Sequence, residues 1–213
     1  LREDLTRQVK STLQANPELL GLALVFEPNG LDGKDELFAG QSDVGSNEKG
    51  RFALYWSQPT PGQLTSMPLP EKDIADTSTG PSGEAANAWF TCPRTTLKPC
   101  VIEPYFYTID GQNVLMTSIV FPLMPNGKLT ASLSVDINLN SLQTISQNAS
   151  KKLYDGQTSV SILSPAGLLA GYSPDASKLS QRLDAVDKTS GAELIRLLAA
   201  SSKTASLHSQ QQL

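Results

Sequence analysis

The stretch that decides the fold is CVIEPYFYTIDGQNVLMTSIVFPLMPNGKLTASLSVDI, residues 100–137. It consists of three β-rich runs separated by two turn signals, Asp110-Gly111 and Asn126-Gly127. Such dipeptides between apolar runs favour tight hairpins, because Gly, Asn and Asp tolerate the left-handed backbone that these turns require. The stretch therefore predicts three consecutive antiparallel strands.

The segments before this sheet predict a helix and two further strands. Leu1, Leu5, Val9 and Leu13 recur every fourth residue, which indicates a helix with one narrow apolar stripe that ends near Pro17. The next segments are LLGLALVFEP and GRFALYWSQ, and both predict buried strands. A Gly- and Asp-rich loop separates them, and the proline-rich run PTPGQLTSMPLPEKD that follows is expected to be irregular.

The segments after the sheet alternate between helical and extended patterns. Residues 138–156 predict a helix, residues 157–174 predict a hairpin that turns at Pro165-Ala166-Gly167, and residues 191–203 predict a last helix. Helices combined with a central antiparallel sheet and hairpins give an α+β protein.

Composition argues for a binding protein without metal or cofactor. The net charge of −4 lacks the clustered Lys and Arg of a nucleic-acid footprint. The single histidine, His208, lies in a polar tail, so both a zinc site and a His-activated nucleophile lack their usual residues. We therefore expect no enzymatic activity, and no apolar run in the chain is long enough to span a membrane.

The two cysteines leave two interpretations open. Cys92 and Cys100 are separated by PRTTLKP, which is not a redox C-x-x-C motif. They are either reduced, buried thiols of a cytosolic protein or a local disulfide of an oxidising compartment. We favour the disulfide, because the polar segment with two prolines predicts a surface loop or hairpin tip that such a bond would close.

The order of these segments resembles the extracytoplasmic double Cache ligand-binding domains of bacterial chemoreceptors, the methyl-accepting chemotaxis proteins of the Pseudomonas type. The resemblance covers nearly the whole chain and rests on WF-x-x-P at 89–93, EPY at 103–105 and VDI at 135–137. The opening FEPNGLDGKDE at 26–36 is similar to receptors for small nitrogenous compounds, in particular the purine-responding group.

This resemblance implies a domain organisation and a location. Residues 1–20 would be an N-terminal signalling helix, part of a long helix that continues from a transmembrane segment. Residues 21–138 would be the membrane-distal, PAS-like ligand-binding module, and residues 139–213 a connecting helix with a small or incomplete membrane-proximal module. The domain would be periplasmic, part of a homodimeric inner-membrane receptor with flanking transmembrane helices outside this chain.

The resemblance also implies a pocket. Amino-acid-sensing relatives carry an Arg-x-Trp-Tyr motif and a distant Asp; here Trp89, Phe90 and Asp136 stand at matching positions, but Asn87 replaces the arginine. Without a guanidinium, a ligand carboxylate loses its bidentate partner, so a plain amino acid is not expected. Asn87 instead offers a donor and an acceptor, which suits the edge of a purine.

Two ligand classes remain open on these residues. A purine such as urate, xanthine or guanine would stack on aromatic rings, with Glu103 and Asp136 accepting from its N–H groups. A biogenic amine or polyamine would instead sit among the same carboxylates and rings as a cation. The same ectodomain could also serve a histidine kinase or a diguanylate cyclase. The aromatic candidates are Trp56, Trp89, Phe90, Tyr105 and Tyr107.

Overall fold

The chain forms two compact units, which we describe separately from a computed structural model covering residues 1–201. The first unit comprises residues 1–102 and 106–138, and the second comprises residues 103–105 and those from Leu139 onward. The end of the predicted 139–213 module, including His208, lies outside the described residues.

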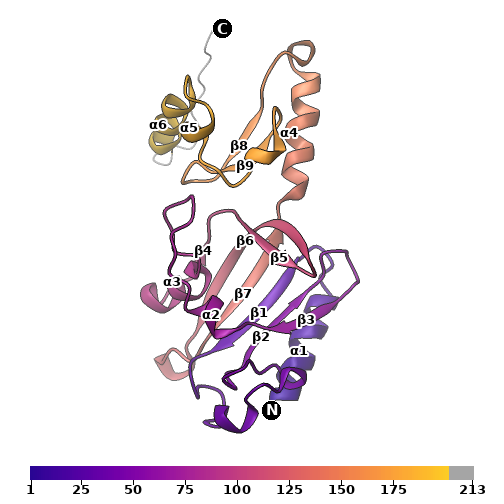
Figure 1. The fold of residues 1–213 in the computed structure, drawn as a ribbon, viewed down its shortest axis with the longest axis vertical. Helices are drawn as coiled ribbons and strands as arrows, with labels where there is room; N and C mark the ends of the chain where they lie inside the picture. The colour runs from indigo at the N-terminus through magenta and orange to yellow at the C-terminus, as the bar shows by residue number, and fades with distance from the viewer. Residues whose placement is uncertain (202–213) are drawn as a thin grey trace. The chain divides into compact units, whose positions relative to one another are not determined.

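The first unit is built on a seven-stranded sheet with the order β3-β2-β1-β7-β6-β4, and β5 also pairs with β6 (Figure 1). The three strands predicted from residues 100–137 are confirmed as β5, β6 and β7, with turns at the two expected dipeptides. The strands are β1 (Gly21–Phe26), β2 (Ala53–Ser57), β3 (Thr65–Pro68), β4 (Cys100–Val101), β5 (Tyr105–Ile109), β6 (Gln112–Leu123) and β7 (Ala131–Asn138).

One face of this sheet packs against the helix α1 (Arg2–Gln14). Directly opposed residues of antiparallel strands point to the same side, so Leu22 of β1 and Val135 of β7 share this face. The predicted apolar stripe reaches it through Val9 and Leu13, and the buried cluster there also contains Leu22. The helix has thirteen residues in the described chain.

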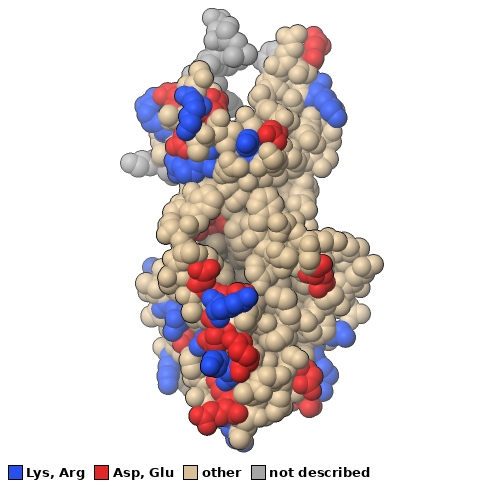
Figure 2. Space-filling view, viewed as in Figure 1, with Lys and Arg blue, Asp and Glu red and all other residues tan. Residues whose placement is uncertain are grey.

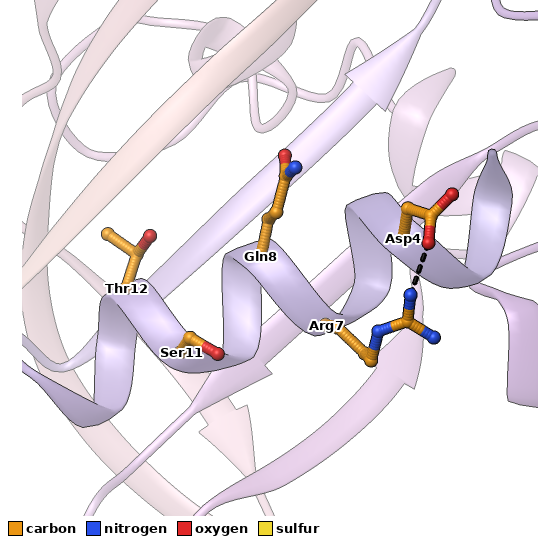
Figure 3. A pocket seen from close by; sticks show the side chains of 5 residues that line it. All are labelled: Asp4, Arg7, Gln8, Ser11 and Thr12. Carbon is orange, nitrogen blue, oxygen red and sulfur yellow. Dashed lines mark hydrogen bonds and ion pairs between the residues drawn. The ribbon is translucent and has the colours of Figure 1, made fainter.

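The outer face of α1 is polar, and Asp4 pairs there with Arg7 (Figure 3). On the face of the first unit that Figure 2 shows, acidic and basic side chains are interspersed.

Beside the helix, an apolar groove of about 440 Å³ runs along the α1 face of the sheet. The groove is lined by Leu5, Gln8, Val9, Thr12, Asn16, Leu19, Leu22, Leu24, Leu123, Leu133 and Val135.

The opposite face of the sheet carries Gly21, Ser57, Ser118 and Asp136, which are cross-strand neighbours in one row. The helices α2 (Glu71–Ile74) and α3 (Ala88–Thr96) belong to the segment between β3 and β4. Cys100 opposes Val120 and therefore points to this second face, and its disulfide with Cys92 places the end of α3 there.

The segment between the cysteines corrects one expectation. Residues 92–100 were predicted as a surface loop or hairpin tip, but Cys92 lies inside α3 and only the residues after Thr96 form a turn. Pro93 is within the helix, where it removes one backbone hydrogen bond without preventing the last turn. Leu97 then ends the helix in a left-handed conformation.

The second unit contains the predicted helix, α4 (Asn140–Lys152), and the predicted hairpin of β8 (Ser161–Leu163) and β9 (Leu169–Tyr172). Gly171 is necessary because an added Cβ would lie 2.7 Å from the Leu142 carbonyl oxygen of α4. The buried apolar residues Leu168, Leu169 and Leu183 form the described core. The unit also holds α5 (Leu183–Val186) and α6 (Gly191–Ser201).

Candidate functional site

A buried carboxylate lies at the centre of the second face of the first unit. Asp136, on β7, is only 4% exposed. The hydroxyl of Ser118, directly opposite on β6, donates to Asp136 Oδ1 over 2.7 Å, and the hydroxyl of Ser134 donates to the same oxygen over 2.8 Å. Both serine hydroxyls donate to the same oxygen, so they hold the carboxylate at Oδ1.

Burial raises the pKa of Asp136 from 3.8 to about 6, because removing a carboxylate from water penalises its charged form. Hydrogen bonds from Ser118, Ser134 and Tyr55 act in the opposite direction and favour the carboxylate. At neutral pH Asp136 is therefore charged, but it holds that charge in an environment that disfavours it.

Gly21 leaves the space that the Tyr55 ring occupies next to Asp136. The ring lies over Gly21, where an added Cβ would be 2.6 Å from both the ring carbon Cε2 and the hydroxyl oxygen of Tyr55. Gly21 opposes Asp136 directly in the β1–β7 register. A residue without a side chain at this point of β1 thus lets the phenol lie beside the carboxylate.

A second tyrosine and a second carboxylate complete this cluster. The Tyr55 and Tyr107 rings meet edge to face with centroids 6.0 Å apart. The pKa of Tyr107 is raised to about 12, first by burial and then by the negative charges of Asp73 and Asp136. Two carboxylates therefore act on one neutral phenol.

Asn87 lies between α2 and α3 and is buried. Its side-chain Nδ2 donates one of its two hydrogens to the Ile74 carbonyl oxygen over 2.9 Å, so part of the amide's donor capacity already serves the fold. Its Oδ1 is buried and has no hydrogen-bond partner among the described residues. Asn87 therefore keeps an acceptor, Oδ1, and the second hydrogen of its amide group for a ligand, and its predicted role stays a prediction.

The aromatic residues of α3 are partly engaged by the protein. The Trp89 and Phe90 ring centroids are 5.8 Å apart. The Arg94 guanidinium lies 4.7 Å from the Phe90 ring centroid and that of Arg51 lies 5.8 Å from it. Arg94 also makes a bidentate ion pair with Glu27 at 2.6 and 2.8 Å. Phe90 thus contacts cations of the protein itself, while Trp89 is half-buried.

Trp56 lies on the wrong face of the sheet to share a pocket with Asp136. It opposes Leu22, which opposes Val135, and it packs against the α1 cluster. The Lys10 ammonium of α1 lies 5.1 Å from its ring centroid. Successive residues of a strand point to opposite faces, so Tyr55 takes the place in the cluster that was expected of Trp56.

Glu103 and Tyr105 fall into the second unit. There the Glu103 carboxylate accepts a hydrogen bond from the Ala166 backbone N–H over 3.1 Å, and the Pro104 carbonyl accepts one from the Ser180 hydroxyl over 3.1 Å. These bonds attach Glu103 to the turn of the β8–β9 hairpin and Pro104 to Ser180, which is a structural role that the sequence did not indicate.

The structure brings two of the predicted candidates, Asp136 and Tyr107, into one cluster. Its other members were not predicted from the sequence: Tyr55, Asp73, Ser118 and Ser134. The signal for one of the serines was present, because Ser132, Ser134 and Asp136 alternate with apolar residues along one strand. The described residues contain no group of three or more His, Cys, Asp or Glu suited to a metal ion.

Comparison with known proteins identifies the family of this chain. Residues 5–144 match the family described as "Methyl-accepting chemotaxis protein-like, first PDC sensor domain". The chain belongs to this family. The matched range contains all of the first unit's sheet, so the Asp136 cluster is part of the PDC sensor domain itself.

A related protein shares much of the sequence of this PDC sensor domain. The methyl-accepting chemotaxis protein TlpQ of Pseudomonas aeruginosa is 56% identical over 200 residues, which cover 94% of this chain and 28% of TlpQ. The chain thus spans just over a quarter of the length of that relative.

Solved structures share the fold of this PDC sensor domain. The extracellular domain of a putative histidine kinase, mmHK1S-Z3, has a TM-score of 0.71 at 24% identity, over 92% of this chain and 65% of that one. The periplasmic sensory domain of the Campylobacter jejuni chemoreceptor Tlp1 has a TM-score of 0.64 at 13% identity, over 93% and 65%. None of the helices in residues 1–201 has the length and apolar content of a membrane-spanning segment.

Proposed function

We propose that this PDC domain is the periplasmic sensor module of a bacterial chemoreceptor and that it binds a small organic cation with an ammonium group at the Asp136 cluster. The burial of the Asp136 carboxylate carries this proposal, since it is only 4% exposed and receives hydrogen bonds from the neutral hydroxyls of Ser118 and Ser134. An ammonium group has donors only, and Asp136, Asp73 and the Asn87 Oδ1 are acceptors.

Energetics support a cation over a neutral ligand. A buried carboxylate without a counter-charge is costly, and the raised pKa of Asp136 reflects that cost. A ligand ammonium would offset it, and the Tyr55 and Tyr107 rings would add cation–π attraction. The site would therefore bind without making or breaking a covalent bond, and we propose no enzymatic activity.

A purine is the second candidate. The buried, unpartnered Oδ1 of Asn87 would accept from a ring N–H, and the half-buried Trp89 offers a stacking surface. Against it, Phe90 already lies beside Arg94, and Trp56 lies on the other face of the sheet. Fewer aromatic rings are thus available to stack on a flat heterocycle than the sequence predicted.

Isothermal titration calorimetry at pH 7.5 distinguishes these ligands. We expect heat of binding with putrescine or histamine and none with urate, xanthine, guanine, hypoxanthine or adenine. Removing one partner of a buried charge pair costs about 2–5 kcal/mol, so Asp136→Asn should weaken the amine at least about thirtyfold. A purine that binds while both amines fail would contradict the proposal.

The larger assembly is also a proposal. The 56% identity to a methyl-accepting chemotaxis protein favours a chemotaxis receptor over a histidine kinase or a diguanylate cyclase. The Cys92–Cys100 disulfide supports a periplasmic location, since such bonds persist in oxidising compartments. The family resemblance also implies a long N-terminal helix, flanking transmembrane helices and a homodimer. The apolar groove beside α1 is a surface against which a further helix of such an assembly could pack.

A further inference from the structure

We propose that Ser118 and Ser134 are positioning residues that orient the Asp136 carboxylate toward the ligand and set the pH range over which this domain senses it. This inference rests on the proposed function for the ligand, but its first test needs no ligand. Neither serine was expected from the sequence to belong to the site.

The geometry separates the two oxygens of the carboxylate. Ser118 lies opposite Asp136 across the β6–β7 register, and Ser134 precedes it by two residues on the same face of β7. Their hydroxyls donate to Oδ1 at 2.7 and 2.8 Å from two directions. A carboxylate held at one oxygen by two rigid strands keeps a fixed plane, so the direction in which its other oxygen can accept is fixed as well.

The two serines also act on the charge of Asp136. Hydrogen bonds to an ionised carboxylate favour the ionised form, and both serines lower the pKa that burial raises. The other groups that face this cluster are the Tyr55 hydroxyl from β2, Tyr107 from β5 and the Asp73 carboxylate from α2. Among these, the Tyr55 hydroxyl stabilises the charge of Asp136 by a hydrogen bond, whereas Asp73 carries a charge of the same sign.

The strand supplies a matched control for this hypothesis. Ser132 lies two residues before Ser134 on the same face of β7 and is 3% exposed. Its buried Oγ has no hydrogen-bond partner among the described residues. Ser132→Ala and Ser134→Ala thus remove the same atom from the same strand, but only the second removes a bond to Asp136.

The first test follows the ¹³Cγ chemical shift of Asp136 against pH in the ligand-free protein. Each bond to a charged group is worth about one pH unit or more in the titration midpoint, so Ser134→Ala and Ser118→Ala should each raise it by about that amount. Ser132→Ala should leave the midpoint unchanged. An unchanged midpoint in both of the first two variants would overturn the proposal, whether or not any amine binds.

The second test measures putrescine affinity at pH 6 and pH 8, where the ammonium groups of putrescine remain protonated. Because only the ionised carboxylate binds a cation, the loss of affinity in Ser134→Ala should be about fivefold greater at pH 6 than at pH 8, where the remaining loss measures the orientation of the carboxylate. Loss that is equal at both pH values would indicate a structural role only and would refute the pH-setting role. Failure of putrescine to bind the wild-type domain refutes the proposed function but leaves the first test decisive.

Discussion

Replacing Asp136 by asparagine should stabilise the ligand-free domain at neutral pH while weakening its binding of an amine. The pKa of Asp136 is about 6 in the folded domain against 3.8 for an unperturbed carboxyl. At a pH between these two pKa values, Asp136 keeps its proton in the folded domain but has lost it in the unfolded chain. The free energy of unfolding therefore falls as the pH rises from about 4 to about 6. Asparagine carries no such charge and should escape this loss.

The magnitude follows from the two pKa values. At 1.36 kcal/mol for each pH unit, the wild-type domain should be less stable than Asp136→Asn by about 3 kcal/mol at pH 7.5 and about 1 kcal/mol at pH 4.5. Urea denaturation followed by tryptophan fluorescence measures both values. Asp43→Asn, which changes an exposed carboxylate of the same unit, should stay within about 0.5 kcal/mol at both pH values. A difference that does not change with pH, or a less stable variant at pH 7.5, would refute the reasoning.

Two further substitutions test the elements around the carboxylate. Gly21→Ala should displace the Tyr55 ring, because atoms of that ring lie 2.6 Å from the added Cβ. The variant should lose about 1–3 kcal/mol of unfolding free energy and should bind the amine more weakly. Wild-type amine affinity in this variant would show that Tyr55 is not part of the site. The double variant Cys92→Ser with Cys100→Ser should lose about 2–3 kcal/mol, measured by thermal unfolding, and dithiothreitol should lower the melting temperature of the wild type but not that of the variant.

The sheet was predictable because its signals are local. Residues 100–137 alternate and turn at Asp110-Gly111 and Asn126-Gly127, and β1 is a continuous apolar run, so strand positions follow from the sequence alone. Proline misled the prediction twice. The proline-rich run was expected to be irregular, but it contains the edge strand β3, which ends at Pro68; an edge strand tolerates proline because one of its sides has no strand to bond to. The segment around Pro93 was expected to be a loop, but it belongs to α3.

The site was only partly predictable, since it depends on which face of the sheet carries it. Asp136 stood out as a charged residue on a buried strand, but alternation along β2 does not reveal whether Tyr55 or Trp56 faces it. That choice depends on α1, which covers the Trp56 face. Asp73 reaches the site from a four-residue helix, and only the fold brings it near Tyr107.

The most direct test of the proposed site is a crystal structure of the domain with the amine that calorimetry selects. The account predicts the ligand ammonium nitrogen about 3 Å from the Asp136 carboxylate, on the side away from Ser118 and Ser134, with a tyrosine ring of the cluster beside it. A ligand bound on the α1 face of the sheet, or one whose nitrogen contacts neither Asp136 nor Asp73, would contradict it.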